Sequence, residues 1–113
     1  MALIYKILSR SEWQAAQQAG QFAGSAVDLA DGYIHFSTAA QAGEIARKHF
    51  SGQADLLVLT LEADNLGEHL KWEPSRGGDL FPHLYVPLAL DQVIAVSEAP
   101  LGDDNVPRLG ALQ

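Results

Sequence analysis

The 113-residue sequence contains no cysteine. This absence excludes disulfide bonds, thiolate nucleophiles and cysteine-based zinc or iron–sulfur sites, and it fits a reducing compartment. No apolar run approaches the ~20 residues that a membrane-spanning helix needs, and the opening "MALIYKILSR" shows neither a basic leader nor a cleavage-like site. We therefore expect a soluble, cytoplasmic protein that does not contact a membrane.

Basic residues are scarce: 7 Lys and Arg stand against 14 Asp and Glu, for a formal net charge of −7. An acidic chain repels phosphate backbones, so nonspecific binding to DNA or RNA is not expected. A local basic cleft stays open as a hypothesis, with Lys6, Lys71 and Arg76 as its candidates. No glycine-rich phosphate fingerprint follows a strand, so a Rossmann or P-loop interpretation has no support.

The composition is otherwise that of an ordinary globular protein, with 48% hydrophobic and 19% charged residues. The length suffices for one domain with its own core. We predict a single domain over residues 1–113, with a core at about 3–98 and a polar C-terminal tail over 101–113. The sequence shows no internal repeats or linkers.

Hydrophobic patterning predicts strands over 2–8, 32–37, 55–63 and 91–99, of which 55–63 is long, apolar and central. Ser9 with Glu12 and Thr38 with Gln41 have capping-box spacing, which predicts two main helices. Residues 20–32 are interpreted as a loop, and the prolines of 80–88 argue against a regular central strand there. The order favours an α+β fold with a mostly antiparallel, perhaps split, sheet.

The stretch "DGYIHFST" places a histidine inside an apolar strand. Side chains alternate along a strand, so Ile34 and Phe36 share a core face while His35 and Ser37 share a polar one. Thr38 then starts a helix, and a helix N-terminus favours anions such as phosphate. The alternative is a structural histidine that donates to a backbone carbonyl and pins a turn.

Two later segments carry further candidates. Glu73 ends the "LKWE" stretch directly before a proline, at a strand end where a polar side chain can turn into a cleft. The alternative is an exposed carboxylate paired with Lys71 or Arg76. His83 and Tyr85 lie two residues apart, so they project together if the chain is extended. Aromatic core packing with one satisfied imidazole is the alternative there.

These signals are compatible with one shared cleft that grips a nucleotide or a sugar. Two histidines and Glu73 could also hold a divalent metal, but no known metal spacing is present and no metal is predicted. Ser37 as a nucleophile with His35 as its base lacks a recognisable nucleophile elbow, so a hydrolytic triad is not favoured. No cofactor is established by the sequence.

Several motifs occur in order across about residues 3–97: "IYKI", "EWQAAQQAG", "DGYIHFSTAAQ", "LLVLTLEADNLG", "LKWE" and "LFPHLYVPL". Together they closely resemble the bacterial family called domain of unknown function 952. That family is similar in fold to the ADP-ribosyltransferases, in which two small sheets clasp NAD. The resemblance therefore implies an ADP-ribosylation fold with NAD or ADP-ribose as a possible ligand.

The resemblance also assigns roles to residues. The functional positions of that fold would fall at Lys6, at or near His35 and at Glu73, which implies that Glu73 and His35 are catalytic and that Lys6 contacts the ligand. The clustering of polar residues on the strand faces and at the helix start adds Ser37, Thr38, His83 and Tyr85 as ligand-binding residues. Many members of the family have histidine where this chain has Lys6, and a lysine can still hold a phosphate as a point charge. The alternative is a non-enzymatic binding or interaction module with structural histidines, whose acidic surface and "FPHLY" segment meet a protein or a small metabolite.

Overall fold

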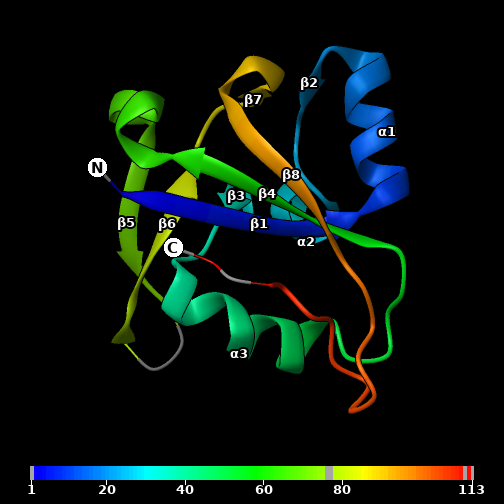
Figure 1. The fold of residues 1–113 in the computed structure, drawn as a ribbon. Coiled ribbons are helices and arrows are strands. Elements are labelled where there is room, and N and C mark those ends of the chain that lie inside the picture. Colours follow the sequence, from blue (N-terminus) through cyan, green and yellow to red (C-terminus); the bar gives the residue numbers. More distant parts are fainter. Residues whose placement is uncertain (1, 76–77, 111, 113) are drawn as a thin grey trace.

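The computed structural model describes residues 2–75, 78–110 and 112, and it has the α+β architecture that the sequence predicts (Figure 1). In chain order its elements are β1 (Leu3–Ser9), α1 (Arg10–Ala19), β2 (Gln21–Phe22), α2 (Ala26–Asp31), β3 (Ile34–His35), α3 (Ala39–His49), β4 (Leu56–Glu62), the 3-10 segment η1 (Ala63–His69), β5 (Leu70–Pro74), β6 (Leu80–Leu84), β7 (Leu88–Ala89), the 3-10 segment η3 (Leu90–Gln92) and β8 (Val93–Ala99).

The strands are divided between two three-stranded sheets, in the orders β1-β4-β8 and β3-β6-β5, and a small β2-β7 pair. All these pairings are antiparallel, which confirms the mostly antiparallel arrangement. Tyr5 and Ser37 join the two larger sheets by exchanging backbone hydrogen bonds of 2.8 and 2.9 Å. The chain segment after β3 is thereby fixed to β1.

The strand β4 is the centre of its sheet, as predicted. Its side chains alternate, so Leu57 and Leu59 join one hydrophobic cluster with Ala16 of α1. Val58 points the other way and joins a second cluster with Ala46 of α3. Helices therefore cover both faces of this sheet, which explains why β4 is apolar almost throughout.

The two predicted capping boxes are both present. Ser9 begins α1 with Glu12 as its partner, and Thr38 begins α3 with Gln41. In each case the cap side chain accepts from the backbone amide three residues on, and the partner side chain accepts from the backbone amide of the cap. Each helix start is thus encoded by four consecutive residues.

The interpretation of residues 20–32 as a loop is wrong, because β2 and the helix α2 lie there. Ser25 and Asp28 form a third capping box at the start of α2. Gly32 follows the helix with φ 88°, the left-handed conformation that favours glycine. The three glycines of this region, Gly20, Gly24 and Gly32, suggested a loop, but they flank the short elements instead of interrupting them.

The expectation that 80–88 cannot form a regular central strand is also wrong, because β6 is the middle strand of the β3-β6-β5 sheet. The carbonyl of Pro82 accepts a hydrogen bond from the amide of Phe36 at 3.0 Å. Both backbone groups of a strand residue point to the same neighbouring strand. The missing N–H of Pro82 therefore falls beside the end of β3, where the short ladder stops and no donor is required.

The segment that follows β8 packs back onto the molecule. Val106, Leu109 and Leu112 contact the hydrophobic cluster that α3 covers, and the amide of Gly52 donates to the carbonyl of Asn105 at 2.8 Å. Apolar residues of the segment predicted as a polar tail thus help to cover the main sheet.

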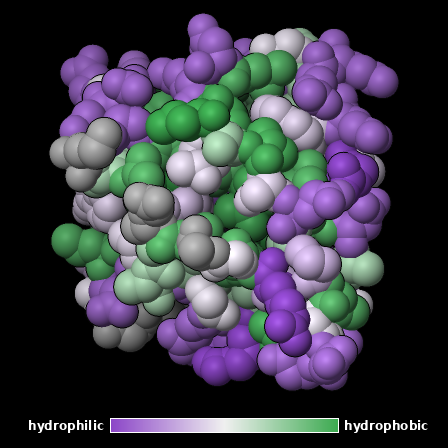
Figure 2. All heavy atoms as spheres, in the orientation of Figure 1, coloured by the Kyte–Doolittle hydropathy of each residue, from purple (hydrophilic) through white to green (hydrophobic). Residues whose placement is uncertain are grey.

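One face of the molecule shows a band of hydrophobic side chains between hydrophilic rims (Figure 2). Ile94 and Val96 of the edge strand β8 are among the large apolar residues that are exposed. Within the described part of the chain, no helix has both the length and the apolar character needed to cross a membrane.

Candidate functional site

The register of the β3-β6-β5 sheet brings the candidate residues together. His83 of β6 lies opposite His35 of β3 on one side and Lys71 of β5 on the other. Because alternate residues share a face, Glu73 and Tyr85 project from the same side as His83. We call this surface the histidine face; it consists of Tyr33, His35, Lys71, Glu73, His83 and Tyr85.

Aromatic rings pack closely on the histidine face. The ring of Tyr33 stacks on His83 with centroids 4.1 Å apart, and it lies 4.7 Å from the ring of His35 and 5.2 Å from that of Tyr85. The two imidazoles meet edge to face at 5.5 Å. Tyr33 therefore lies over His83, whose side chain is only 4% exposed.

Glu73 is held by two donors. Its Oε1 accepts from the Nδ1 of His83 at 2.9 Å and from the hydroxyl of Tyr85 at 2.5 Å. These hydrogen bonds, first that of Tyr85 and then that of His83, lower the pKa of Glu73 below its ordinary value. The hydrogen bond with Glu73 raises the pKa of Tyr85 to about 12. Among the described residues both of these contacts use Oε1, so Oε2 can accept a hydrogen bond from a ligand.

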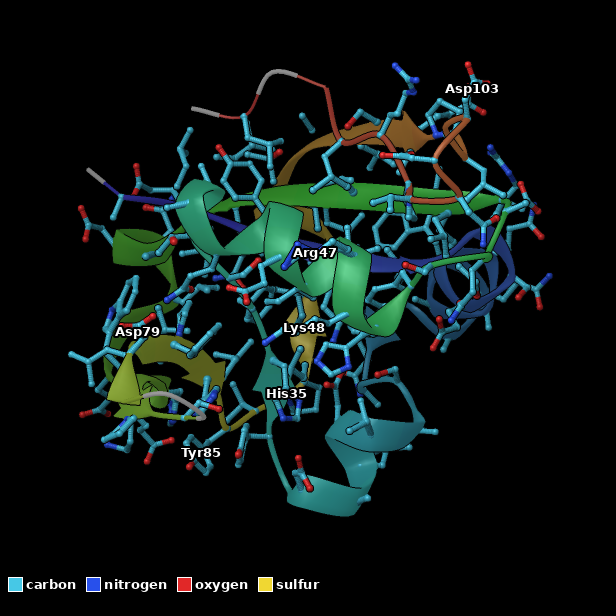
Figure 3. All side chains as sticks on the ribbon, turned by 90° about the horizontal axis from the view of Figure 1, so that it is seen from below. His35, Arg47, Lys48, Asp79, Tyr85 and Asp103 are labelled. Atoms are coloured by element: carbon cyan, nitrogen blue, oxygen red, sulfur yellow. The ribbon has the colours of Figure 1, made fainter. Side chains whose placement is uncertain are left out.

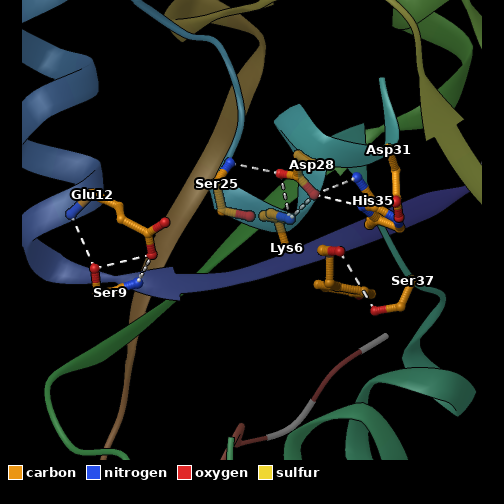
Figure 4. A network of polar contacts seen from close by, with 9 residues as sticks. Lys6, Ser9, Glu12, Ser25, Asp28, Asp31, His35 and Ser37 are labelled. Atoms are coloured by element: carbon orange, nitrogen blue, oxygen red, sulfur yellow. Dashed lines mark hydrogen bonds and ion pairs between the residues drawn. The ribbon is translucent and has the colours of Figure 1, made fainter. Parts of the chain in front are cut away.

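His35 is anchored by Asp28 of α2 (Figure 4). An oxygen of Asp28 lies 2.6 Å from the Nδ1 of His35 and also accepts from the His35 backbone amide at 3.2 Å. The other oxygen accepts from the amide of Ser25 at 2.9 Å. Side chain and backbone of His35 are thus fixed by one carboxylate, which is itself fixed by the start of its helix.

Lys6 lies on the far side of the same carboxylate, with its ammonium 2.8 and 3.0 Å from the two oxygens of Asp28. Burial lowers the pKa of Lys6 and the charge of Asp28 opposes this shift without cancelling it. Burial also pushes the pKa of Asp28 upward, but the hydrogen bond of His35 and the charge of Lys6 outweigh burial, so that pKa lies well below its ordinary value. The result is a buried ion pair directly behind His35.

The second nitrogen of His35 is also engaged. Its Nε2 lies 2.9 Å from a carboxylate oxygen of Asp31, the last residue of α2. Carboxylates only accept hydrogen bonds, so both contacts are satisfied when each ring nitrogen carries a proton. The ring of His35 is thus held between one buried and one half-exposed carboxylate.

The structure gathers four of the predicted site residues, His35, Glu73, His83 and Tyr85, and it separates the rest from them. Ser37 is buried against β1, where its hydroxyl lies 3.5 Å from the carbonyl of Tyr5. The hydroxyl of Thr38 accepts from the amide of Gln41 as the helix cap.

The basic cleft suggested by the sequence does not form from the residues that the structure describes. Lys6 is buried against Asp28, so it acts on the site through that carboxylate. Lys71 is exposed on the histidine face, while Arg76 lies outside the described residues.

Sequence reasoning missed Asp28 and Asp31, which together hold His35. The available signal was Ser25 three residues before Asp28, a capping-box spacing followed by glycine at position 32. Within the described ranges, no group of three or more His, Asp or Glu side chains could hold a metal ion. Asp28 and Asp31 bind opposite nitrogens of one ring, so their oxygens do not converge on a common point with it.

A hollow of about 160 Å³ adjoins the histidine face. Its lining includes Tyr33 and Tyr85 together with Asp28, Gly32 and Pro87. A cavity of roughly 150 Å³ accommodates one benzene-sized ring, so this hollow has room for a single heterocycle and for no whole dinucleotide. A larger hollow of about 360 Å³ lies elsewhere, between α1 and β8, and is lined by none of the histidine-face residues.

The fold and the site together describe a small α+β protein in which two antiparallel sheets meet beside a cluster of histidines, tyrosines and carboxylates. The chain belongs to the family described as "Protein of unknown function (DUF952)", whose model matches residues 7–96. The resemblance seen in the sequence motifs is thereby confirmed at the level of the family.

Solved structures of a similar protein exist. The chain is 59% identical to protein CC0527 from Caulobacter crescentus, whose crystal structure matches with a TM-score of 0.93 over 96% of this chain and 95% of that chain. The solution NMR structure of CC0527 matches with 59% identity and a TM-score of 0.88, over 97% of this chain and 95% of that chain. No curated protein matches this chain.

Proposed function

We propose that the protein binds a nucleotide of the ADP-ribose or NAD type on the histidine face. The observation that carries this proposal is the cross-strand pair His35–His83, which brings the "YIHFS" and "FPHLY" motifs together with Glu73 of "LKWE". A ligand on this face would meet the imidazole of His35, the rings of Tyr33 and Tyr85 and the carboxylate of Glu73, while His83 lies beneath Tyr33 and holds Glu73.

The shapes and donors of the site suit the sugar and one ring of such a ligand. The hollow beside Tyr33 and Tyr85 admits a single heterocycle, which aromatic side chains bind by stacking. The Oε2 of Glu73 can accept a hydrogen bond from a ribose hydroxyl. Held ionised by Tyr85 and His83, the same carboxylate is placed to stabilise an oxocarbenium-like transition state if the glycosidic bond is cleaved.

The roles of individual residues differ from those implied by the resemblance. Glu73, Tyr85 and Tyr33 contact the ligand, and His35 supplies a donor at the edge of the site. Lys6 orients His35 through Asp28. Ser37 and Thr38 support the backbone from behind, because their hydroxyls are engaged by β1 and α3. We propose that the protein works in the cytoplasm, which the absence of cysteine fits.

The test is a titration with NAD, ADP-ribose and adenosine, followed by calorimetry and by NMR of the imidazole and tyrosine signals. The proposal expects shifts at His35, His83 and Tyr85, and weaker binding in Glu73→Gln. The matched control is Asp103→Asn, an exposed carboxylate that lies far from His35 and Tyr85 (Figure 3). If millimolar ligand moves no signal of the histidine face, the proposal is wrong.

A second candidate is a non-enzymatic interaction module. It is favoured by Trp72 and Leu80, large apolar side chains that stay exposed on the β5–β6 hairpin. By alternation Trp72 lies on the opposite side of the sheet from Glu73. Replacement of Trp72 by Ser would then abolish binding of the partner molecule, while Glu73→Gln would leave that binding intact. The reverse result would favour the nucleotide site.

A further inference from the structure

We infer that the Nε2 of His35 is an anion-binding point, and that Asp31 occupies it as an internal stand-in for the phosphate or carboxylate group of a ligand. The inference rests on the proposed function for the identity of the whole ligand, but the anion point can be tested by itself. It follows from the different surroundings of the two nitrogens of His35.

The contact between the Nδ1 of His35 and the carboxylate of Asp28 is buried and fixed by several partners. The side chain of Asp28 is 1% exposed and is held by Lys6, by Ser25 and by the backbone of His35. A buried carboxylate cannot leave such a set of partners without stranding their charges and donors. This side of the ring therefore stays in place.

The contact at Nε2 is exchangeable. The side chain of Asp31 is 46% exposed, and that of His35 is 32% exposed. An ion pair so open to water contributes little to stability, because water and salt compete for both partners. An incoming anion can therefore replace Asp31 without disturbing the fold.

The charges of the site leave room for one anionic group. Lys6 and Asp28 neutralise each other behind the ring. When both nitrogens of His35 carry a proton toward their carboxylate oxygens, the ring has one positive charge, which Asp31 balances. On its other sides His35 faces the uncharged ring of Tyr33 and the imidazole of His83. When Asp31 turns away, a phosphate or carboxylate oxygen is the group that restores both the hydrogen bond and the charge balance.

The position of Asp31 in its helix agrees with this role. Asp31 is the last residue of α2, where the dipole of a helix disfavours a negative charge. Gly32 follows at once with φ 88°. Helix stability thus gives no reason for an aspartate here, whereas the contact with His35 does.

The experiment uses inorganic phosphate as the probe and measures its affinity by calorimetry at constant ionic strength, with the side-chain nitrogen signals of His35 followed by NMR. We compare the native protein with Asp31→Asn and, as a second variant, Asp31→Ala. The control Asp103→Asn removes the same charge at the opposite end of the molecule (Figure 3). Removal of a competing half-exposed pair should strengthen phosphate binding about 1.5- to fivefold.

The gain must disappear in Asp31→Asn combined with His35→Gln. Adenosine, which has no phosphate, must bind the native protein, Asp31→Asn and Asp103→Asn alike. Equal phosphate affinity in Asp31→Asn and Asp103→Asn, or a gain that survives without His35, overturns the inference, as does the failure of every variant to bind phosphate. ADP-ribose that binds natively but gains nothing from Asp31→Asn leaves the proposed function intact and removes this inference. If Asp31→Asn binds phosphate more tightly but no variant binds ADP-ribose, this inference holds and the proposed function is wrong.

Discussion

His35 of β3 and His83 of β6 lie opposite each other, and each contacts a carboxylate. In one pair the carboxylate is the buried partner, and in the other pair the imidazole is. At His35 the carboxylate of Asp28 is buried while the imidazole is partly open. At His83 the imidazole is buried under Tyr33 while the carboxylate of Glu73 is 36% exposed. The same pair of groups thus presents an imidazole to solvent in one case and a carboxylate in the other.

The two carboxylates therefore have different roles: Asp28 holds a side chain in place, and Glu73 is accessible to a ligand. Asp28 is neutralised by Lys6 and holds His35, so removing it disturbs the interior. Glu73 is held by His83 and Tyr85, so removing it changes what the surface offers to a ligand. The following changes test that contrast, from the largest expected effect to the smallest.

The largest effect is expected for Asp28→Asn, compared with the matched Glu73→Gln. Loss of the buried charge leaves the ammonium of Lys6 without its counter-ion, which typically costs about 3–5 kcal/mol. Chemical denaturation should therefore show a large loss of unfolding free energy for Asp28→Asn and a small one for Glu73→Gln. Equal losses would refute the contrast.

A double replacement checks the cause of that loss. Lys6→Met combined with Asp28→Asn removes both charges and keeps an amide oxygen at position 28 to accept from the backbone amides of Ser25 and His35, so it should recover much of the stability lost in Asp28→Asn. If the double variant is no more stable than the single one, an unpaired ammonium is not the reason for the loss.

A smaller effect is expected for His35→Ala. The carboxylate of Asp28 keeps its contacts with Lys6 and with the backbone amides, so the change removes one buried hydrogen bond and costs roughly 1–3 kcal/mol. Thermal denaturation measures this loss. A melting temperature equal to that of the native protein would mean that His35 contributes nothing to the fold.

The stability of the fold in acid should depend on the carboxylate of Asp28. The folded-state pKa of Asp28 lies below its unfolded value, so the group favours the folded protein above about pH 4 and this contribution disappears as the pH falls further. Urea midpoints measured from neutral to acidic pH should fall in the native protein and fall less in Asp28→Asn. Parallel curves for the two proteins would contradict the buried ion pair.

The smallest change concerns Tyr85 and leaves the fold intact. Its pKa of about 12 depends first on the hydrogen bond with Glu73, so Glu73→Gln should bring that pKa down toward the ordinary tyrosine value of about 10. The ring-carbon NMR signal of Tyr85 reports its ionisation. An unchanged titration in Glu73→Gln would show that the carboxylate is not the cause.

Local rules predicted much of the fold. Capping boxes located α1 and α3, and the apolar run 55–63 located the central strand, because these signals lie within a few consecutive residues. The Pro-rich β6 was misjudged because tolerance of Pro82 depends on where its neighbour β3 ends, a fact about pairing that its own segment does not contain.

The site was predictable where strand alternation applies and unpredictable where distant partners decide. Alternation placed His35 apart from Ile34, and His83 with Tyr85. The register that sets His35 opposite His83 is long-range, and so is the choice of Asp28 as the partner of Lys6. The pairing of Ser37 is also long-range, because its backbone and side chain contact Tyr5 of β1, which is far away in the sequence.

The backbone amide of His35 donates to the side chain of Asp28 and to no neighbouring strand. Hydrogen exchange at this one amide therefore follows the opening of the Asp28 carboxylate cluster. Exchange at the amide of Ser37, which donates to the carbonyl of Tyr5, follows separation of the two sheets. The ratio of the two exchange rates therefore tells whether the site opens locally or only when the whole molecule unfolds.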